Sequence, residues 1–499
     1  MNYIQKNGLI AIDKSEVDAA IKAQKFIGIN KNPRDEQVII SLTSFPPRIQ
    51  NLKYAIYSLL NQTFPADMVI LWLAYEEFPN RENDLPKDLL EMTSYGLKIE
   101  WCENLRSYKK LIPALEKYPD SLIATADDDI YYSPNWLKIL YEEHLKFPQY
   151  IIAHRCHRIG IDGNGKIFPY HKWYNELISM SPIPLYENFC TSGAGVLYSK
   201  KLLHGDITNR EIFDKLAPKA DDIWFWAMAV LNGTKIKIPA NAISNLIYID
   251  ADEQIGGETL SSTNFIGGND LQLQNVISKY PAIVGKLLQE AAMFKPYISI
   301  IAVIKNSAEL SSIFENVRSN HFADFEVIAV NIGSRLDTQN LPHNFKLINF
   351  SYGTISAARN VGFNKSNGDF VIFTDAKNFF VNGALPNIAN FVNKFNADVI
   401  HFSAHFKVAE NKIYYVADDE FGGGNNKFAF APLNKQVRAI NWFQGKLSRR
   451  LDTKIFKREF LTKHNFKFDE NDYSEFIFSC LMAAEKYLLT SQAFLIGDD

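Results

Sequence analysis

The sequence predicts an α/β protein in which a doubly wound, mainly parallel sheet is built twice along the chain. Short apolar runs alternate with amphipathic segments, as strands and helices alternate in βαβ units. The same order of segments begins again near residue 296, which indicates an internal duplication. A chain of 499 residues is also too long for one ordinary core.

The elements of both copies follow from apolar spacing. In the first copy, apolar runs predict strands over residues 37–42, 68–73, 97–101, 121–126 and 150–153. Helical spacing predicts helices over residues 52–60, 108–118 and 135–147. In the second copy, strands are expected over residues 298–304, 326–331, 345–350 and 369–374, and helices over residues 308–317 and 355–364.

The domain boundaries come from the stretch between the copies. Residues 256–270 contain two Gly-Gly pairs and read as a loop, and residues 271–290 read as a helix interrupted at Pro281. We therefore predict an N-terminal extension, a first domain, a linker helix and a second domain, over residues 1–36, 37–265, 266–295 and 296–499.

Composition excludes several classes of protein. A net charge of -3 gives no overall basic field, so neither nucleic acid nor an anionic membrane is favoured as a bulk partner. The four cysteines lack metal-site spacing and predict free thiols. No apolar run reaches the roughly 18 residues that cross a bilayer. We expect a cytoplasmic protein, and peripheral membrane contact stays open.

Three adjacent acids, Asp127, Asp128 and Asp129, directly follow the apolar run 121–126. Ligands of open α/β sheets bind beyond the carboxyl ends of strands. On an extended chain Asp127 and Asp129 point the same way, and two such oxygens suit a Mg²⁺ or Mn²⁺ ion that also binds a diphosphate. The alternative is a solvated acidic turn before a helix that begins at Ser133-Pro134.

Two later motifs add candidates. Gly193 and Gly195 precede a short apolar run and predict close approach of a ligand to the backbone, or else a bulged strand. Asp221 and Asp222 open a helical segment, and one of them suffices as its cap. Trp224 in that segment reads as a core residue or as a platform for a sugar.

Four stretches of the first copy resemble family 2 nucleotide-sugar-dependent glycosyltransferases, which have the GT-A fold. They are Ile39–Ile49, Tyr108–Leu115, Ala126–Ile130 and Ala220–Phe225. The resemblance implies two GT-A domains in tandem, joined by a helical linker. It assigns the metal to Asp129 and Asp127, and the catalytic acids to Asp222, as general base, and Asp221. Within this mechanism the candidates for contact with the nucleotide sugar are Thr43, Arg48, Glu76, Lys110, Asp127 and Asp128. The alternative for Thr43, Arg48, Glu76 and Lys110 is that they are solvated loop residues. The candidates for contact with the acceptor or sugar are Gly193, Gly195 and Trp224.

The second copy resembles the same family but departs from it at its acids. The likeness is carried by Ile298–Ile304, Ile328–Ser334, Ala357–Gly362, Gly368–Asp375 and Thr453–Leu461. The aspartates that the family has before Gly-Ser are Asn331 and Ile332 here. The Asp-x-Asp motif becomes Asp375-Ala-Lys377, and a protonated lysine does not coordinate a metal. The acidic pair aligns with Glu475-Phe476. We predict a degenerate, non-catalytic second domain.

The resemblance implies metal-dependent transfer of a sugar from a nucleoside-diphosphate sugar to a hydroxyl of a glycan or lipid-linked glycan, with inversion. Mn²⁺ or Mg²⁺ is the expected cofactor. By analogy, the setting is capsule or lipopolysaccharide synthesis at the inner face of the cytoplasmic membrane. The alternative is a non-catalytic scaffold that binds glycans or partners. A nucleotidyltransferase is disfavoured because the loop after the first strand, residues 43–48, has no glycine.

Overall fold

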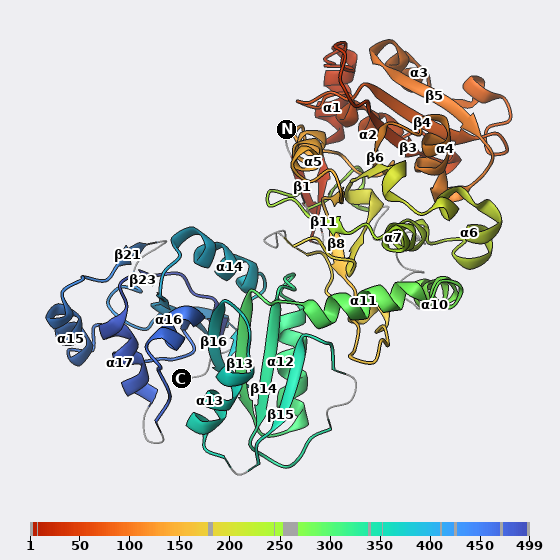
Figure 1. Cartoon of the computed structure of the whole chain (residues 1–499). Helices are drawn as coiled ribbons and strands as arrows, with labels where there is room; N and C mark the ends of the chain where they lie inside the picture. Colours follow the sequence, from red (N-terminus) through yellow and green to blue (C-terminus); the bar gives the residue numbers. More distant parts are fainter. Residues whose placement is uncertain are drawn as a thin grey trace. The chain divides into compact units, whose positions relative to one another are not determined.

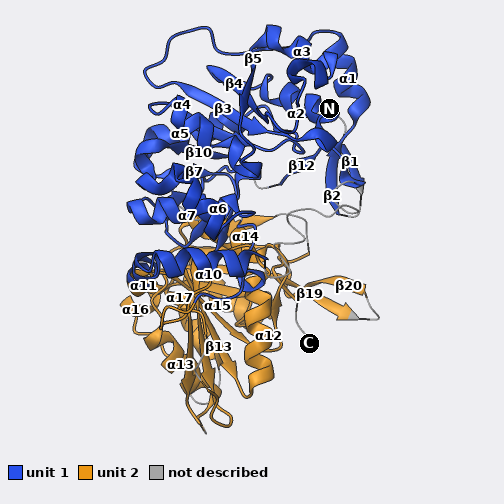
Figure 2. Cartoon of the chain, turned by 90° about the vertical axis from the view of Figure 1, so that its right-hand side faces the viewer, with its two compact units in different colours: residues 1–159, 167–290 blue, residues 160–166, 291–499 orange. Residues whose placement is uncertain are grey.

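The computed structural model of the chain contains two compact units (Figure 2). Unit 1 comprises residues 1–159 and 167–290, and unit 2 comprises residues 160–166 and 291–499. The residues that the structure describes are 3–6, 8–177, 183–243, 245–252, 268–337, 341–351, 353–409, 412–423, 427–469 and 473–496. The predicted boundary at residues 265 and 266, and most of the Gly-rich stretch 256–270, lie outside the described residues.

Unit 1 is organised on a seven-stranded sheet with the order β11-β7-β10-β6-β3-β4-β5. Its strands are β3 (Val38–Thr43), β4 (Met68–Ala74), β5 (Leu97–Cys102), β6 (Leu122–Ala126), β7 (Ile151–Ala153), β10 (Val196–Ser199) and β11 (Ile236–Lys237). Strands β6, β3, β4 and β5 run parallel, and β10 is antiparallel to both β6 and β7. Strands β3, β4 and β6 are almost wholly buried, so they read as continuous apolar runs.

The helices of unit 1 are α1 (Lys14–Lys22), α2 (Leu52–Leu59), α3 (Lys87–Glu91), α4 (Ile112–Lys117), α5 (Trp136–Lys146), α6 (Arg210–Leu216), α7 (Asp221–Asn232), α10 (Asn269–Lys279) and α11 (Ala282–Met293). Helices α2 and α5 supply Leu52, Ile56 and Leu140 to the core that covers one face of the sheet. The chain breaks between α10 and α11 around Pro281, as predicted. Strand β2 (Leu9–Ile12) pairs with β1 (Tyr3–Lys6) and β12 (Ile247–Tyr248), so residues 3–6 and 9–12 pack within unit 1.

Two short strands and a 3₁₀ helix complete the part of unit 1 that carries the candidate site. Strand β8 (Cys156–Arg158) pairs with β9 (Asn188–Cys190). The helix predicted over residues 108–118 is split into a 3₁₀ turn, Arg106–Lys110, and α4. Pro113 lies in the first turn of α4, where its missing N–H costs little.

Unit 2 has an eight-stranded sheet with the order β15-β14-β13-β16-β22-β18-β23-β21. Its strands are β13 (Ile298–Ile304), β14 (Phe325–Asn331), β15 (Phe345–Asn349), β16 (Phe370–Asp375), β18 (Val399–Phe402), β21 (Phe428–Phe430), β22 (Lys454–Lys457) and β23 (Tyr487–Thr490). A smaller sheet contains β17 (Phe379–Phe380), β24 (Leu495–Ile496), β19 (Ala404–Ala409) and β20 (Lys412–Ala417). The helices are α12 (Ser307–Arg318), α13 (Ile355–Lys365), α14 (Ala384–Phe395), α15 (Lys435–Phe443), α16 (Arg458–Lys463) and α17 (Tyr473–Ala483).

The two sheets repeat one topology. Seven strands of unit 2, taken from β15 to β23, follow the same spatial order as the seven strands of unit 1 taken from β5 to β11. The directions also agree, because β16 and β18 are both antiparallel to β22, as β6 and β7 are to β10. Figure 1 shows the parallel strands β13, β14 and β15 side by side. Unit 2 therefore carries a second version of the fold of unit 1, and β16 corresponds to β6.

Among the described residues, every helix is too short or too polar to cross a lipid bilayer.

Candidate functional site

The three consecutive acids of unit 1 lie at the carboxyl end of β6, as predicted. Strand β6 is buried over its full length and ends at Ala126. The peptide N–H of Asp127 donates to the Tyr132 hydroxyl (2.7 Å), which in turn donates to the carbonyl oxygen of Gly193 (2.8 Å). These two bonds fix the turn that follows β6 against the loop before β10.

Arg48 neutralises two of the three acids. It ends a 3₁₀ turn, Pro46–Arg48, directly after β3. Its Nη1 lies 2.8 Å from Asp128 Oδ1 and 3.0 Å from Asp129 Oδ2. The Ser44 hydroxyl donates to the other oxygen of Asp128 (2.6 Å). Burial raises the pKa of Asp128 and outweighs the opposing effect of Arg48 and Ser44.

Lys110 connects the acids after β6 with the acids of α7. This side chain is nearly buried, and its Nζ lies 2.7 Å from Asp127 Oδ1 and 3.2 Å from Asp221 Oδ2. Burial opposes its charge, but Asp127, Asp221 and Asp222 together raise the pKa of Lys110 well above its ordinary value. The two acidic motifs, almost 100 residues apart in sequence, therefore share one ammonium group.

Asp221 and Asp222 are the first two residues of α7, and neither caps the helix. Ala220 is the N-cap residue and makes no side-chain capping bond, so neither acid has the capping role that the sequence left open for them. At the first turn, their charge interacts favourably with the helix dipole. The N–H of Ser192 donates to Asp222 Oδ1 (3.0 Å), and its hydroxyl donates to the same oxygen. Both carboxylates are therefore held in place without capping the helix.

The pKa of Asp222 is raised to about 6. Burial is the main cause and the charge of Asp221 adds to it, whereas Lys110 and the bonds from Ser192 oppose the rise. A carboxylate with such a pKa is a far better proton acceptor near neutral pH than an exposed aspartate.

The two glycines before β10 serve packing inside the protein. A Cβ at Gly193 would lie 2.5 Å from Asp127 Oδ2, and one at Gly195 would lie 2.2 Å from the indole nitrogen of Trp136. Gly195 is buried and has a φ of +108°. The predicted ligand contact at Gly195 is therefore wrong, and at Gly193 the neighbour that requires glycine is a carboxylate of the protein itself.

Gly195→Ala is expected to destabilise unit 1 by roughly 3 kcal/mol, because it adds backbone strain and overlaps the Trp136 ring. Gly205→Ala is the matched control, since a Cβ there has no heavy atom within 4 Å. Urea denaturation of the two variants checks the expectation. Equal midpoints for Gly195→Ala and the wild type would contradict it.

Other predicted site residues have different surroundings. Trp224 has an exposed fraction of 0% and donates to the carbonyl oxygen of Ile207, so it is a core residue and the predicted acceptor contact is wrong. The Thr43 hydroxyl donates to the carbonyl oxygen of Trp72 (2.8 Å). Glu76 is exposed in the loop after β4, while its neighbour Glu77 pairs with the buried Lys109.

Ser44, Tyr132 and Ser192 contact the acids, and sequence reasoning did not assign them. Ser44 lies in the loop after β3 that contains Arg48, and Ser192 directly precedes Gly193. A search for hydroxyl side chains adjacent to the chosen motifs finds these two. Tyr132, five residues after Asp127, carries no such signal.

Asp127 and Asp129 are the candidates for a divalent ion that is bound together with a diphosphate, although each also pairs with a cation of the protein, Lys110 and Arg48 respectively. Among the described residues, no three His, Cys, Asp or Glu side chains are grouped so that they could hold a metal ion. Mg²⁺ is commonly bound by one or two carboxylates and by phosphate oxygens of the substrate, which needs no third acid. The side chains of Asp127 and Asp129 are 34% and 18% exposed, so both remain accessible at the sheet edge.

The corresponding strand ends of unit 2 carry different chemistry. Asn331 donates to the carbonyl oxygen of Ser334 and to Asn349 Oδ1, and its own Oδ1 accepts from the N–H of Gly333. Its amide group is thus used within the loop. At the end of β16, Asp375 Oδ1 accepts from the N–H of Lys377 and from the side chain of Asn378.

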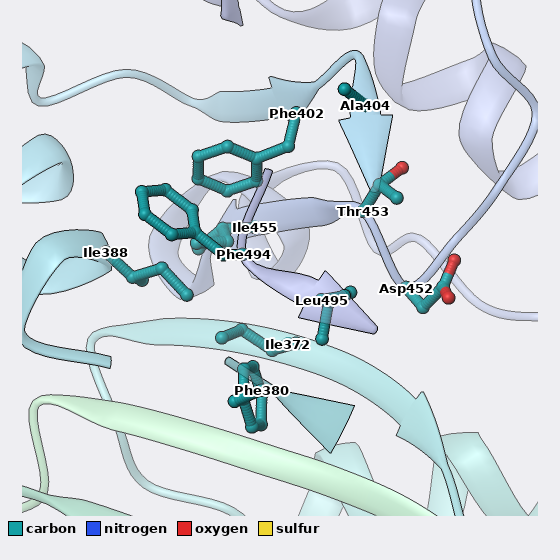
Figure 3. Close-up of a pocket in the computed structure, with 10 residues that line it drawn as sticks. All are labelled: Ile372, Phe380, Ile388, Phe402, Ala404, Asp452, Thr453, Ile455, Phe494 and Leu495. Atoms are coloured by element: carbon teal, nitrogen blue, oxygen red, sulfur yellow. The ribbon is translucent and has the colours of Figure 1, made fainter. Parts of the chain in front are cut away.

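A cavity in unit 2 is too small for a substrate. It has about 10 Å³ of free space, which is room for about one water molecule. Figure 3 shows its largely apolar lining, to which Asp452 and Thr453 add the side-chain oxygens. This void is a packing feature.

Part of the chain is similar to known proteins. Residues 299–464, within unit 2, match the family model described as Glycosyl transferase family 2. No curated protein matches the sequence. Crystal structures of S. aureus TarS 1-349, alone and in complex with UDP, match with 20% identity and a TM-score of 0.32. The matched part covers 40% of this chain and 60% of the TarS chain, which is less than two thirds of that protein. The likeness to glycosyl transferase family 2 therefore lies in unit 2, over residues 299–464.

Proposed function

We propose that unit 1 is a glycosyltransferase domain that moves a sugar from a nucleoside-diphosphate sugar to a hydroxyl group of a glycan acceptor. The observation that carries the proposal is the arrangement around Lys110, which holds Asp127 at the end of β6 and Asp221 at the start of α7. The repeated topology supports it, because unit 2 has the same strand order and is similar to family 2 over residues 299–464.

In this proposal Asp222 is the general base. Ser192 fixes one of its oxygens, and the raised pKa suits acceptance of a proton from the acceptor hydroxyl as that oxygen attacks the anomeric carbon. Attack from the side opposite the leaving group gives inversion. Lys110 keeps Asp222 ionised near neutral pH, because its charge lowers the pKa of that carboxyl.

The acids after β6 form the donor side in this proposal. Asp129 and Asp127 would hold a Mg²⁺ or Mn²⁺ ion, which as a Lewis acid stabilises charge on a departing diphosphate. Asp128 is fixed by Ser44 and Arg48 and orients the loop after β3. Thr43 and Glu76, near the ends of β3 and β4, remain candidates for contact with the nucleotide part of the donor.

For unit 2 we propose a non-catalytic role, in acceptor binding or assembly. The amide of Asn331 is bonded within its own loop, and Lys377 stands where a second acid of an Asp-x-Asp motif would be. The proposed setting is the synthesis of a surface polysaccharide, and this step rests on family analogy.

A thermal-shift screen of nucleotide sugars, each with and without Mn²⁺, tests the proposed function. A true donor at about 100 times its Kd should stabilise the chain by about 2.7 kcal/mol, and the shift should need the metal. Free sugars that lack the diphosphate serve as controls. If all common nucleotide sugars leave the melting temperature unchanged in the presence of Mn²⁺, the proposal is wrong.

A further inference from the structure

Helix α15 of unit 2 exposes three apolar side chains and buries a charged one. Val437, Ile440 and Phe443 follow one another at intervals of three and share one broad face, since an α-helix has about 3.6 residues per turn. Ile440 and Phe443 are 53% and 71% exposed. The buried residues of the helix are Arg438 and Trp442, four apart on the other side. A surface helix normally has the reverse arrangement.

The buried face of α15 is firmly packed, so the outward face is not the result of a loose helix. The Arg438 guanidinium donates to the carbonyl oxygens of Leu481 (2.7 Å) and Ala484 (2.6 Å) at the end of α17. Trp442 packs against Phe478 of the same helix. Figure 1 shows α15 at the periphery of unit 2, beside α17. The exposed face of α15 is therefore fixed in direction, and at its end Phe443 also contacts Phe478, so this face borders α17.

The segment before α15 adds more exposed apolar side chains. Phe428 and Phe430 lie two apart in β21, so both point to the same side of this edge strand, and more than half of each is exposed. Leu433, between β21 and α15, is 79% exposed. The rings of Phe428 and Phe430 contact Phe395 of α14, so we leave them aside and call the four residues Leu433, Val437, Ile440 and Phe443 the apolar surface of unit 2.

The same segment has a strong local charge, although the net charge of the chain is -3. Between Phe421 and Leu451 there are six basic residues and no acidic one. Lys427, Lys435 and Arg449 are exposed. Two of the others meet acids just outside the segment, since Lys446 lies 3.9 Å from Glu420 and Arg450 lies 2.7 Å from Asp452. The apolar surface is thus accompanied by cations.

We propose that the apolar surface of unit 2 binds the face of an anionic lipid bilayer. A helix with aromatic and aliphatic residues on one side and cations near it lies in the plane of the headgroups, with the apolar side chains below them. The lack of acids from Phe421 to Leu451 favours anionic lipid over a protein of mixed charge. Contact with lipid removes the exposed apolar side chains from water, which favours binding. A partner bound by charge alone would leave these side chains in water.

Flotation of the full chain with lipid vesicles tests this proposal. The wild type should float with vesicles of phosphatidylcholine and phosphatidylglycerol, and much less with phosphatidylcholine alone. Binding should weaken in about 1 M salt, where the Debye length falls to about 3 Å. Ile440→Ser combined with Phe443→Ser should lower the partition coefficient about tenfold. Lys427→Gln combined with Lys435→Gln should lower it about 25-fold on the anionic vesicles only.

The matched control is Leu145→Ser combined with Leu271→Ser, which removes two equally exposed apolar side chains from unit 1 and should float like the wild type. The substituted residues are exposed, although Phe443 loses its ring contact with Phe478, so melting temperatures should fall by no more than a few degrees. The proposal is overturned if the wild type does not float with anionic vesicles, or if the α15 variant floats equally well. It is also overturned if the α15 substitutions dissolve a dimer, seen by light scattering, and leave flotation unaffected; the surface is then a contact between copies.

Discussion

Asp222→Asn is expected to lower the turnover number for sugar transfer by about 10³-fold, the usual contribution of a positioned general base. The amide keeps the size of the side chain and can still accept from Ser192, so donor binding should stay within about twofold of the wild type. Transfer of radiolabelled sugar to a glycan extract measures turnover, and calorimetry measures donor affinity. Turnover at the wild-type level would refute the base assignment.

The pH profile separates loss of a base from loss of structure. With a pKa of about 6, the fraction of Asp222 able to accept a proton falls about tenfold for each pH unit below that value. The wild-type kcat/KM should therefore rise up to about pH 6 and then level off. The residual activity of Asp222→Asn should not show this rise of kcat/KM at acidic pH, which we call the acidic limb. Glu475→Gln, in the corresponding helix of unit 2, is the matched control and should keep both turnover and profile.

Lys110→Met should have the second large effect, on both stability and the pH profile. Removing one partner of a buried ion pair costs roughly 3 kcal/mol, and here Asp221 is left without the ammonium 3.2 Å away. Lys110 also lowers the pKa of Asp222, so its loss should move the acidic limb of kcat/KM to higher pH. Chemical denaturation and the pH profile of the same variant measure the two effects.

Lys109→Met is the control for that experiment. Lys109 is equally buried, but its ammonium pairs with Glu77 and not with the acids of β6 and α7. We expect comparable destabilisation and an unshifted pH profile. If both lysine variants shift the limb equally, Lys110 has no special influence on Asp222 and serves only the stability of the fold.

The fold was largely predictable because its strands are buried on both faces. Runs such as residues 68–73 and 298–304 contain little but apolar residues, and they became β4 and β13. The resemblance of the second copy to family 2 is confirmed by the family match over residues 299–464. The assignment of the catalytic role to the first copy remains our proposal.

The candidate site was less predictable, because its residues interact through space. Composition alone does not show that Lys110 reaches both Asp127 and Asp221, or that Arg48 binds two acids. The two glycines predict that another group approaches the backbone closely, but they do not say which group. At Gly193 and Gly195 the neighbours are the side chains of Asp127 and Trp136. Trp224 belongs to the apolar pattern of its helix and lies in the core. At this position the helical pattern was a better guide than the residue type, which also suits a sugar-binding platform.

The most direct test of the central claim compares acids at the corresponding strand ends of the two units. Metal-linked stabilisation by the donor should be measured by thermal shift for Asp129→Asn, after β6, and for Asp375→Asn, at the end of β16. If donor and metal bind in unit 1, Asp129→Asn loses most of the shift and Asp375→Asn keeps it. Loss of the shift in Asp375→Asn with retention in Asp129→Asn would place the donor in unit 2 and contradict the account.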